Sequence, residues 1–428
     1  MHYSRRDFLR TSALLGAASC LTRLPAHAAS KDLPDWLTPK TQILDAVNRC
    51  RPLRGATIPR DIAGRLATAH VSGRYHFTSE PFVVEGVQRI RAMGLGGAKL
   101  WFSSINRAYR WNSQWNLPEH YTLLELAQHP YFARALDEPL DVFALEVYPA
   151  NNPAVKAVPG HSVSPLTDFA VDEQQIYELT RHLLTKYRTR DVTFILQNWE
   201  GDWMFRGDVR KQWLAGEYPE LDLRVDTFRK WFDARQRGVE RARAEITGSR
   251  CRVYHAVELN KVLDSLKGIP TLATHVLPHI RPDFISWSAY DGMRTDKHNG
   301  NETAVGLWHG IDVIKHYAHT AQPAVDGRAA VYLGEAGVPE EMHPEGPTVD
   351  IMDATLGVTL ARDLPWLFHW ELYCNERKDG DRVRLPGPDT AEELRGFWLV
   401  KPDGSLGYTG KYFADVLAHA GKTLPARG

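Results

Sequence analysis

The chain has 428 residues, of which 43% are hydrophobic and 24% are charged, and it carries 52 basic against 52 acidic side chains. This composition excludes a disordered, collagen-like or coiled-coil protein, and the balanced charge argues against a nucleic-acid partner, so we expect neutral partners. Thirteen tryptophans are the unusual count, because a surplus of indoles indicates either core filling or a flat apolar surface kept for a ligand.

The first 28 residues have the features of an export segment. Paired arginines stand in Ser-Arg-Arg-Asp-Phe-Leu at 4–9, a short weakly apolar run covers 12–18, and Ala-His-Ala at 26–28 is a small-x-small cleavage site. The segment resembles a twin-arginine signal peptide, which implies the twin-arginine translocase as a partner and a periplasmic or secreted bacterial protein. The alternatives are a membrane anchor, for which the run is too short, and a lipoprotein cysteine at Cys20. We expect a signal peptide at 1–28, one domain at 29–428 and no membrane span.

Three further cysteines, Cys50, Cys251 and Cys374, lack Cys-x-x-Cys spacing. Their number and spacing indicate neither a zinc site nor a disulfide scaffold. At most one disulfide can form among them, and three buried free thiols are the alternative.

Short β-branched or aromatic runs alternate along the chain with longer segments of helical periodicity, the pattern of βα units in a parallel sheet. The predicted strands are 51–58, 97–103, 141–148, 191–199, 251–258, 283–290, 329–335 and 365–371. The clearest predicted helices are 80–93, which Gly94 would cap, and 172–187, 225–246, 302–319, 349–362 and 408–420. Eight units predict an α/β fold, a closed (β/α)8 TIM barrel with long aromatic-rich βα loops. A doubly wound sheet is the weaker alternative, because no Gly-x-Gly-x-x-Gly turn follows a strand.

The candidate site consists of polar residues that close the apolar runs, since barrel enzymes place their chemistry at the C-terminal ends of strands. The fourth run ends in Asn198-Trp199-Glu200, and the seventh ends in Gly334-Glu335. Two opposed carboxylates are what glycosidic cleavage requires, one to protonate the leaving oxygen and one to attack or to activate water. Acidic residues at a barrel rim also serve solvation or pairing with arginine, which is the structural alternative.

Aromatic and polar residues at other strand ends are the expected support. Tyr290 is suited to hydrogen-bond a nucleophilic carboxylate, and Trp370 to form a sugar platform, although each residue taken singly also fits a core position. The predicted substrate-binding residues are Asn198, Tyr290, Trp370, His255, Trp101 and Trp203. Tryptophans at predicted strand ends are expected on the active face and those within strands in the core; the first group is Trp101, Trp111, Trp115, Trp199, Trp203 and Trp370, the second Trp287 and Trp366.

These residues resemble the strand ends of clan A glycoside hydrolases, the retaining (β/α)8 enzymes. The resemblance implies that Glu200 is the acid/base and that Glu335, in Gly-Glu-Ala-Gly, is the nucleophile. Tyr290 and Trp370 match the tyrosine after strand six and the tryptophan after strand eight of that clan. One departure is clear, because the clan has Asn directly before the acid/base, whereas Trp199 intervenes here. The departure leaves the partner of the substrate 2-hydroxyl open and allows Asp202 to contribute, although Glu200 has the longer reach.

The resulting interpretation is a retaining glycoside hydrolase that acts on neutral, β-linked poly- or oligosaccharide and needs no metal and no cofactor. A carbohydrate-binding barrel without catalysis, or a glycosidase of an exopolysaccharide or biofilm export system, are the alternatives. The signatures His-Glu-x-x-His, Gly-x-Ser-x-Gly and Walker A are missing from the sequence. His309, His316 and His319 share one predicted helix, and we interpret them as a helical face and not as metal ligands.

Overall fold

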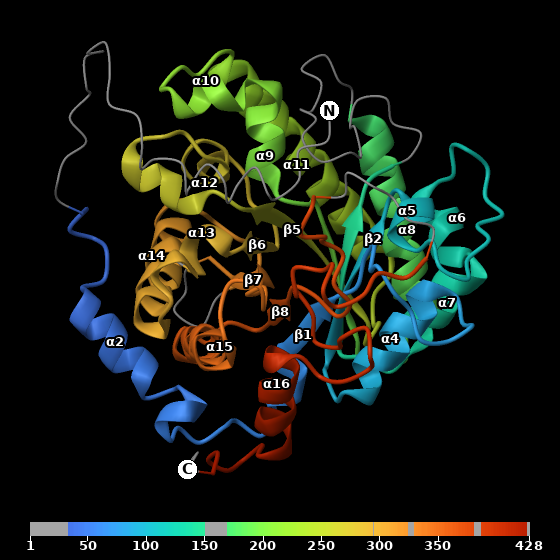
Figure 1. The fold of residues 1–428 in the computed structure, drawn as a ribbon. Coiled ribbons are helices and arrows are strands. Elements are labelled where there is room, and N and C mark those ends of the chain that lie inside the picture. Colours follow the sequence, from blue (N-terminus) through green and yellow to red (C-terminus); the bar gives the residue numbers. More distant parts are fainter. Residues whose placement is uncertain (1–32, 150–168, 294, 324–328, 381–386, 426–428) are drawn as a thin grey trace.

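The structure, a computed structural model, describes residues 33–149, 169–293, 295–323, 329–380 and 387–425. It is a closed barrel in which eight parallel strands pair in chain order and β8 pairs with β1 (Figure 1). The strands are β1 (Leu66–Ala69), β2 (Gly97–Phe102), β3 (Val142–Val147), β4 (Thr193–Gln197), β5 (Arg252–Leu259), β6 (Phe284–Ser288), β7 (Val331–Ala336) and β8 (Leu367–His369). The predicted (β/α)8 barrel is confirmed.

Helices surround the barrel, and shorter helices follow several strand ends (Figure 1). The longer ones are α2 (Lys40–Asn48), α4 (Phe82–Ala92), α7 (Pro130–Asp137), α8 (Ala170–Lys186), α11 (Leu221–Glu245), α14 (Gly300–Tyr317), α15 (Glu345–Ala361) and α16 (Tyr408–Ala418). The short ones are η1 (Pro52–Arg54), α3 (Ile62–Arg65), α5 (Ile105–Ala108), α6 (Leu123–Gln128), α9 (Gly201–Arg206), η2 (Gly207–Val209), α10 (Arg210–Leu214), η3 (Val262–Lys267), α12 (Leu272–His275), η4 (Leu277–His279), α13 (Tyr290–Met293) and η5 (Thr295–Lys297). No helix in the described ranges has the length and apolar character to cross a bilayer. The export segment predicted at 1–28 lies outside those ranges.

Seven predicted strands and the six predicted helices match observed elements, and Gly94 caps α4 with a positive φ of 77°. The first strand was predicted wrongly: β1 lies at Leu66–Ala69, and the run 51–58 holds η1 instead. Arg51 explains the difference, since its buried guanidinium pairs with Asp353 at 2.6 Å and also with Asp350, both on α15. These ion pairs hold the segment that contains Arg51 against α15, outside the barrel.

The barrel interior has an apolar half and a polar half. Alternate residues of each strand face inward, and those nearer the N-terminal strand ends form an apolar cluster of Ala67, Val142, Ala144, Ile195, Ala256, Tyr332 and Phe368. Two residues further along their strands come Glu146, Gln197 and Glu258, all fully buried. The sequence thus builds a polar layer directly under the end of the barrel where the strands terminate.

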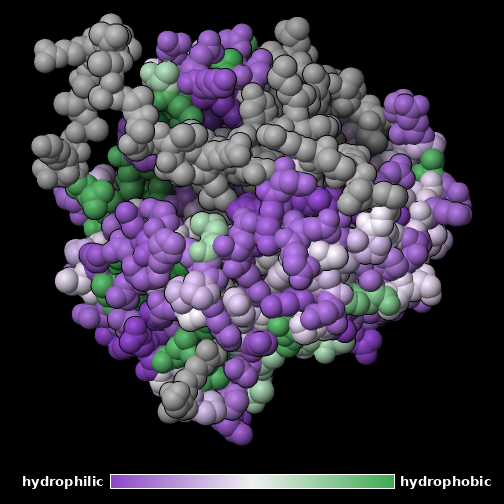
Figure 2. All heavy atoms as spheres, in the orientation of Figure 1, coloured by the Kyte–Doolittle hydropathy of each residue, from purple (hydrophilic) through white to green (hydrophobic). Residues whose placement is uncertain are grey.

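The remaining predictions about single residues have simple outcomes. Cys50, Cys251 and Cys374 are all free thiols. Trp287 is fully buried, and Trp366 packs against the apolar cluster of the barrel interior, as predicted for core tryptophans. His309 and His316 have structural partners: His309 Nε2 lies 3.0 Å from the Thr38 carbonyl, and the His316 ring stacks on Trp36. The described surface in Figure 2 is largely hydrophilic, with apolar residues scattered across it.

Candidate active site

An irregularity in β7 turns Glu335 toward the barrel interior. Tyr332 faces inward, where its hydroxyl donates to Gln197 Oε1, so strict alternation would send a residue three positions later outward. The pairing of β7 with both neighbours shifts here, and Ser288 of β6 becomes the partner of Glu335. Gly334 is required at the shift, because a Cβ there would collide with the Ser286 hydroxyl. The absence of a side chain at Gly334 therefore makes room for the interior side chains of Ser286 and Glu258.

Two donors hold the two oxygens of the Glu335 carboxylate. The Tyr290 hydroxyl donates to Oε2 at 3.1 Å, and the Lys99 ammonium donates to Oε1 at 3.0 Å. Tyr290 follows β6 and Lys99 lies on β2, so the carboxylate is fixed from two sides of the barrel. Glu335 is fully buried. Opposite charge and hydrogen bonding both favour the ionised form that a nucleophile needs.

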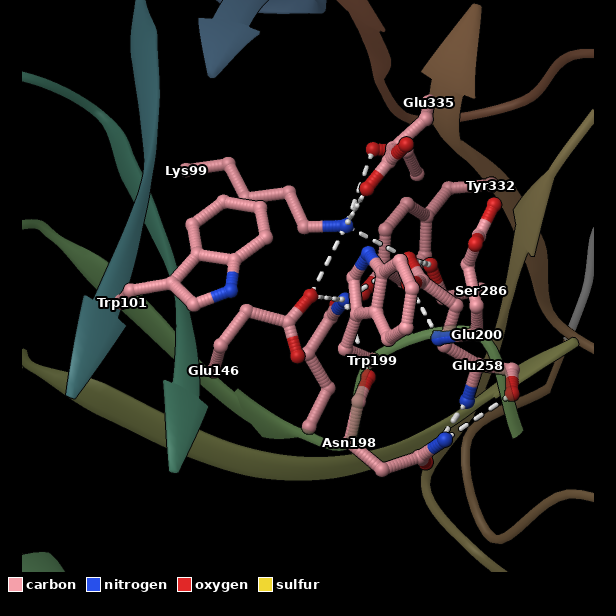
Figure 3. Close-up of polar contacts among 12 residues, drawn as sticks. Lys99, Trp101, Glu146, Asn198, Trp199, Glu200, Glu258, Ser286, Tyr332 and Glu335 are labelled. Atoms are coloured by element: carbon pink, nitrogen blue, oxygen red, sulfur yellow. Dashed lines mark hydrogen bonds and ion pairs between the residues drawn. The ribbon is translucent and has the colours of Figure 1, made fainter. Parts of the chain in front are cut away.

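Lys99 is the centre of a buried ion cluster (Figure 3). Its ammonium lies 2.9 Å from Glu146 Oε1, 2.7 Å from Glu258 Oε2 and 3.0 Å from Glu335 Oε1, and all four side chains are fully buried. One oxygen from each carboxylate lies within 4.8 Å of the others. We call Lys99, Glu146, Glu258 and Glu335 the floor cluster. One positive charge thus faces three acidic groups inside the barrel.

Two neutral side chains complete the floor cluster. Gln197 donates to Glu146 Oε1 at 3.0 Å and to Glu258 Oε2 at 2.8 Å, and the Ser286 hydroxyl donates to the same Glu258 oxygen at 2.8 Å. Because each acceptor has several donors, the cluster is well determined in geometry.

Burial and charge move the pKa values within the floor cluster in opposite directions. Burial alone would lower the pKa of Lys99, but Glu146, Glu258 and Glu335 raise it well above its ordinary value. Burial raises the pKa of Glu146 to about 8, opposed by Lys99 and reinforced by Glu258 and Glu335. Glu146 Oε2 has no hydrogen-bond partner among the described residues. At neutral pH Glu146 is therefore a neutral acid, and Lys99 stays charged for Glu335.

Replacing Glu146 by Gln should flatten the pH dependence of folding stability. A group whose pKa rises on folding, here from 4.5 to about 8, gives stability that is present below the lower value and is lost as the pH rises through the upper one. Over that window the wild-type free energy of unfolding should fall, relative to Glu146→Gln, by up to about 1.4 kcal/mol per pH unit. Denaturant unfolding at several pH values measures this, with exposed Glu217→Gln as control. Parallel curves for wild type and Glu146→Gln would contradict the assignment.

β4 ends at Gln197, and the backbone leaves extended geometry at Glu200. Gln197 faces the floor cluster, and Trp199 follows with its backbone N–H donating to the Tyr148 hydroxyl at 2.7 Å. In the view of Figure 3 the Trp199 ring overlaps the floor cluster. Glu200 then takes a left-handed conformation, φ 31° and ψ 62°, and begins α9. The intervening tryptophan thus occupies the inward position and moves Glu200 further along the chain.

The side chain of Asn198, a residue predicted to bind substrate, is hydrogen-bonded to the backbone of β5. Its Nδ2 donates to the Glu258 carbonyl at 3.0 Å, and its Oδ1 accepts from the Glu258 backbone N–H at 2.9 Å. The carboxamide therefore substitutes for a backbone partner beside β5, where β4 has already ended. Because Asn198 lies between inward-facing Gln197 and Trp199, its side chain points to the neighbouring strand and not into the site.

Glu200 is buried, with 3% of its surface exposed, beside the end of β5. Its backbone N–H donates to Glu258 Oε1 at 3.1 Å. Burial lowers the pKa of the nearby Lys261 ammonium to about 8. The carboxylates of Asp291, Asp264 and Glu200 oppose this shift, because each raises that pKa. Glu200 does not belong to the group of carboxylates that lie within 4.8 Å of one another. It therefore sits at the edge of the floor cluster, with a cation nearby.

Asp202 is a structural clamp. Its Oδ2 accepts from the backbone N–H groups of Asn260 and Lys261 at 2.9 and 3.1 Å, and its Oδ1 accepts from Leu272 at 2.8 Å. Both oxygens of the Asp202 carboxylate, which the sequence allows as a possible contributor to catalysis, thus accept hydrogen bonds from the backbone. They also fix the start of α9 to the segment after β5.

The predicted tryptophans lie in different surroundings. Trp101 and Trp370 meet edge to face with ring centroids 5.6 Å apart, and the Lys99 ammonium lies 5.3 Å from the Trp101 ring centre. Two cations lie over the Trp203 ring, with Arg210 4.4 Å and Lys261 4.6 Å from its centre. Trp101 and Trp370 are thus beside the floor cluster, whereas Trp203 belongs to the wall that α9 builds.

His255 does not line the site. Its Nδ1 lies 3.2 Å from Gln236 Oε1 of α11, and its backbone N–H donates to Asp283 at 3.0 Å. Tyr254 and Glu258 occupy the opposite parity of β5, so His255 faces outward between the barrel wall and α11. His255, predicted to bind substrate, is thus held between β5 and α11.

Sequence reasoning missed Lys99, Glu146 and Glu258 as site residues. A signal for them exists, because each is a charged residue inside an otherwise apolar strand at the inward parity: Glu146 is two residues after Ala144, and Glu258 is two after Ala256. Charges at such positions must be paired. Counting parity within each strand would have placed all three in one interior layer.

Comparisons with known proteins give fold likeness only. No family model and no curated protein matches the chain. Among solved structures it is similar to a GH5_18 variant from Bifidobacterium longum subsp. longum in complex with Manβ1-4GlcNAc, at 13% identity over 85% of this chain and 80% of that chain, TM-score 0.48. It is also similar to a GH39 β-xylosidase from Caulobacter crescentus, at 12% identity over 86% and 73%, TM-score 0.44. A third similar structure is the GH53 catalytic domain from Ignisphaera aggregans, at 10% identity over 84% and 97%, TM-score 0.42.

Proposed function

We propose that the protein is a glycoside hydrolase that cleaves β-linked carbohydrate with retention of configuration. The observation that carries the proposal is the Glu335 carboxylate at the end of β7, fixed by the Tyr290 hydroxyl on one oxygen and the Lys99 ammonium on the other. A buried, ionised and oriented carboxylate is what attack on an anomeric carbon requires. Trp101 and Trp370 beside it supply flat apolar surface for a sugar ring.

In the proposed reaction Glu335 attacks the anomeric carbon while Glu200 gives a proton to the departing oxygen. A water molecule then loses a proton to Glu200 and releases the sugar from Glu335. Lys99 and Tyr290 stabilise the carboxylate before attack and again when it leaves. The chemistry needs no metal and no organic cofactor, and the substrate is a neutral poly- or oligosaccharide.

The activity is tested by incubating the protein with β-glucans, mannans, xylans and exopolysaccharides and recording product sizes. Proton NMR of the first product gives the anomeric configuration. Release of the β-anomer from a β-linked substrate is the expected result. Release of the α-anomer would contradict retention, and no hydrolysis of any member would contradict the enzyme assignment.

Removing Glu200 should separate the two chemical steps. With a 2,4-dinitrophenyl β-glycoside, whose leaving group needs no proton, Glu200→Ala should still form the glycosyl-enzyme but should release sugar roughly 10²–10⁴-fold more slowly. Azide, which needs no general base, should then restore turnover and give a β-glycosyl azide. Glu217→Ala, at an exposed position, is the control. Full activity of Glu200→Ala on an unactivated substrate would assign the proton to another group.

A carbohydrate-binding barrel without catalysis is the second candidate. The observation that favours it is the end of β4, where Trp199 takes the inward position and Glu200 lies outside the mutually close carboxylates. Binding of an oligosaccharide that remains uncleaved after long incubation would support this candidate.

We also propose that the protein works after export, as a periplasmic or secreted protein that the twin-arginine translocase carries. The support is the segment 1–28, with its paired arginines and its cleavage site. Replacing both Arg5 and Arg6 by Lys should retain the protein in the cytoplasm, which fractionation with immunoblotting measures.

A further inference from the structure

Two polar side chains beside Glu335 have buried atoms without partners. Asn260 is 3% exposed and Ser288 is fully buried. Neither the Asn260 Oδ1 nor the Ser288 hydroxyl has a hydrogen-bond partner within the described part of the chain. Buried polar atoms are almost always hydrogen-bonded, because leaving them unpaired costs free energy. These two atoms therefore point to a ligand that supplies the missing hydrogen bonds.

Strand register places the two side chains in one row with Glu335. Leu259 of β5 pairs with Trp287 of β6, so Asn260 and Ser288 are the next residues on these neighbouring strands. Ser288 in turn pairs with Glu335 of β7. Asn260, Ser288 and Glu335 thus stand at the ends of three adjacent strands.

Asn260 and Ser288 lie one layer nearer the strand ends than Glu258 and Ser286, and Glu335 belongs both to this row and to the floor cluster. Glu258 and Ser286, each two residues earlier, face inward and bond each other at 2.8 Å. By the alternation of strands, Asn260 and Ser288 continue on the same side. Glu258 and Ser286 are partnered within the lower layer, whereas the Asn260 Oδ1 and the Ser288 hydroxyl have no partner among the described residues.

Asn260 is held rigidly, since its backbone N–H donates to Asp202 Oδ2 at 2.9 Å. The Asn198 amide, which was predicted to bind substrate, is hydrogen-bonded through both its nitrogen and its oxygen to the Glu258 backbone. The amide that remains with an unused oxygen at this edge is that of Asn260. A fixed acceptor beside a hydroxyl is suited to bind a ligand hydroxyl group.

We propose that Asn260 and Ser288 bind the sugar 2-hydroxyl, the hydroxyl on the carbon next to the reacting carbon. They would do so in place of Asn198, whose amide is bound to the Glu258 backbone. The inference rests on the proposed glycosidase function. Attack by Glu335 brings the anomeric carbon to this row, and the neighbouring carbon carries the nearest hydroxyl. That hydroxyl donates to Asn260 Oδ1 and exchanges a hydrogen bond with the Ser288 hydroxyl.

The test compares two substrates in three variants. The probes are the p-nitrophenyl β-glycoside of the sugar that the polysaccharide screen identifies and its 2-deoxy analogue. Asn260→Ala and Ser288→Ala should each lower kcat/KM at least tenfold on the 2-hydroxy substrate and less than twofold on the 2-deoxy substrate. Ser249→Ala, whose hydroxyl bonds Leu184 at the other end of the barrel, should change neither.

A second readout is independent of activity. Because Ser288 has no protein partner for its hydroxyl, Ser288→Ala should have an unchanged or higher melting temperature without substrate. Equal losses on both substrates, or a lower melting temperature for Ser288→Ala, would overturn the inference while leaving the proposed function standing. A wild type that cleaves neither glycoside and none of the polysaccharides would overturn both.

Discussion

Glu335→Gln should lose activity on the order of 10⁴-fold or more while keeping the native fold. The amide has the shape of the carboxylate, so its oxygen can accept from Lys99 and its NH₂ can donate to Tyr290, the two groups that hold Glu335 at 3.0 and 3.1 Å. It cannot form a glycosyl ester. Steady-state kinetics on the substrate found in the screen measures the loss, and circular dichroism checks the fold.

Two further variants make this result specific. Glu302→Gln, which removes a partly exposed carboxylate on α14 that pairs with Lys40, should retain wild-type activity. In Glu335→Gly, azide should enter the empty place and give a glycosyl azide of inverted configuration. Wild-type turnover by Glu335→Gln would remove Glu335 from the mechanism.

Lys99→Met should destabilise the protein by about 3–5 kcal/mol at pH 7, because it leaves buried carboxylates without a counter-charge. The loss should shrink as the pH is lowered, because a buried carboxylate that has lost its counter-charge takes up a proton more readily. Chemical denaturation between pH 5 and 8 measures both effects. The same change at Lys40, whose ion pair with Glu302 is on the surface, should cost less than about 1 kcal/mol.

An equal effect of Lys99→Met and Lys40→Met at pH 7 would show that the floor cluster does not depend on its lysine. Adding Glu146→Gln to Lys99→Met should recover little stability, because burial already keeps Glu146 neutral at that pH. This difference separates the role of Lys99 toward the ionised carboxylates from simple filling of the interior.

The barrel could be predicted because strand and helix periodicities repeat eight times, and seven strands lie where the sequence indicates. The first strand could not, since Leu66–Ala69 is only four residues long and the stronger β pattern at 51–58 is overridden by Arg51 and its remote partners on α15. A local residue pattern cannot predict an ion pair between Arg51 and residues of α15, which lie far along the chain.

Within the candidate site, it was easier to predict which residues take part than which way their side chains point. The contact of Tyr290 with Glu335 is confirmed, because both follow strand ends that meet at one edge. His255 and Asn198, both predicted to bind substrate, have side chains that contact α11 and the β5 backbone. The Glu335 side chain points inward because the register shifts in β7. The residue pattern of β7 alone does not predict this shift. Such a shift is visible only once β6 and β8 are paired with it.

The floor cluster also has a consequence for how the barrel is assembled from its parts. Lys99 and Glu146 come from the first four strands, whereas Glu258 and Glu335 come from the last four. A half barrel made from β5–β8 alone would contain the interior carboxylates of Glu258 and Glu335 but would lack Lys99, which neutralises them. The two halves of this chain are therefore electrostatically unequal, and closing the barrel neutralises charge as well as covering apolar surface. Any split of the gene at the midpoint would produce fragments that need each other.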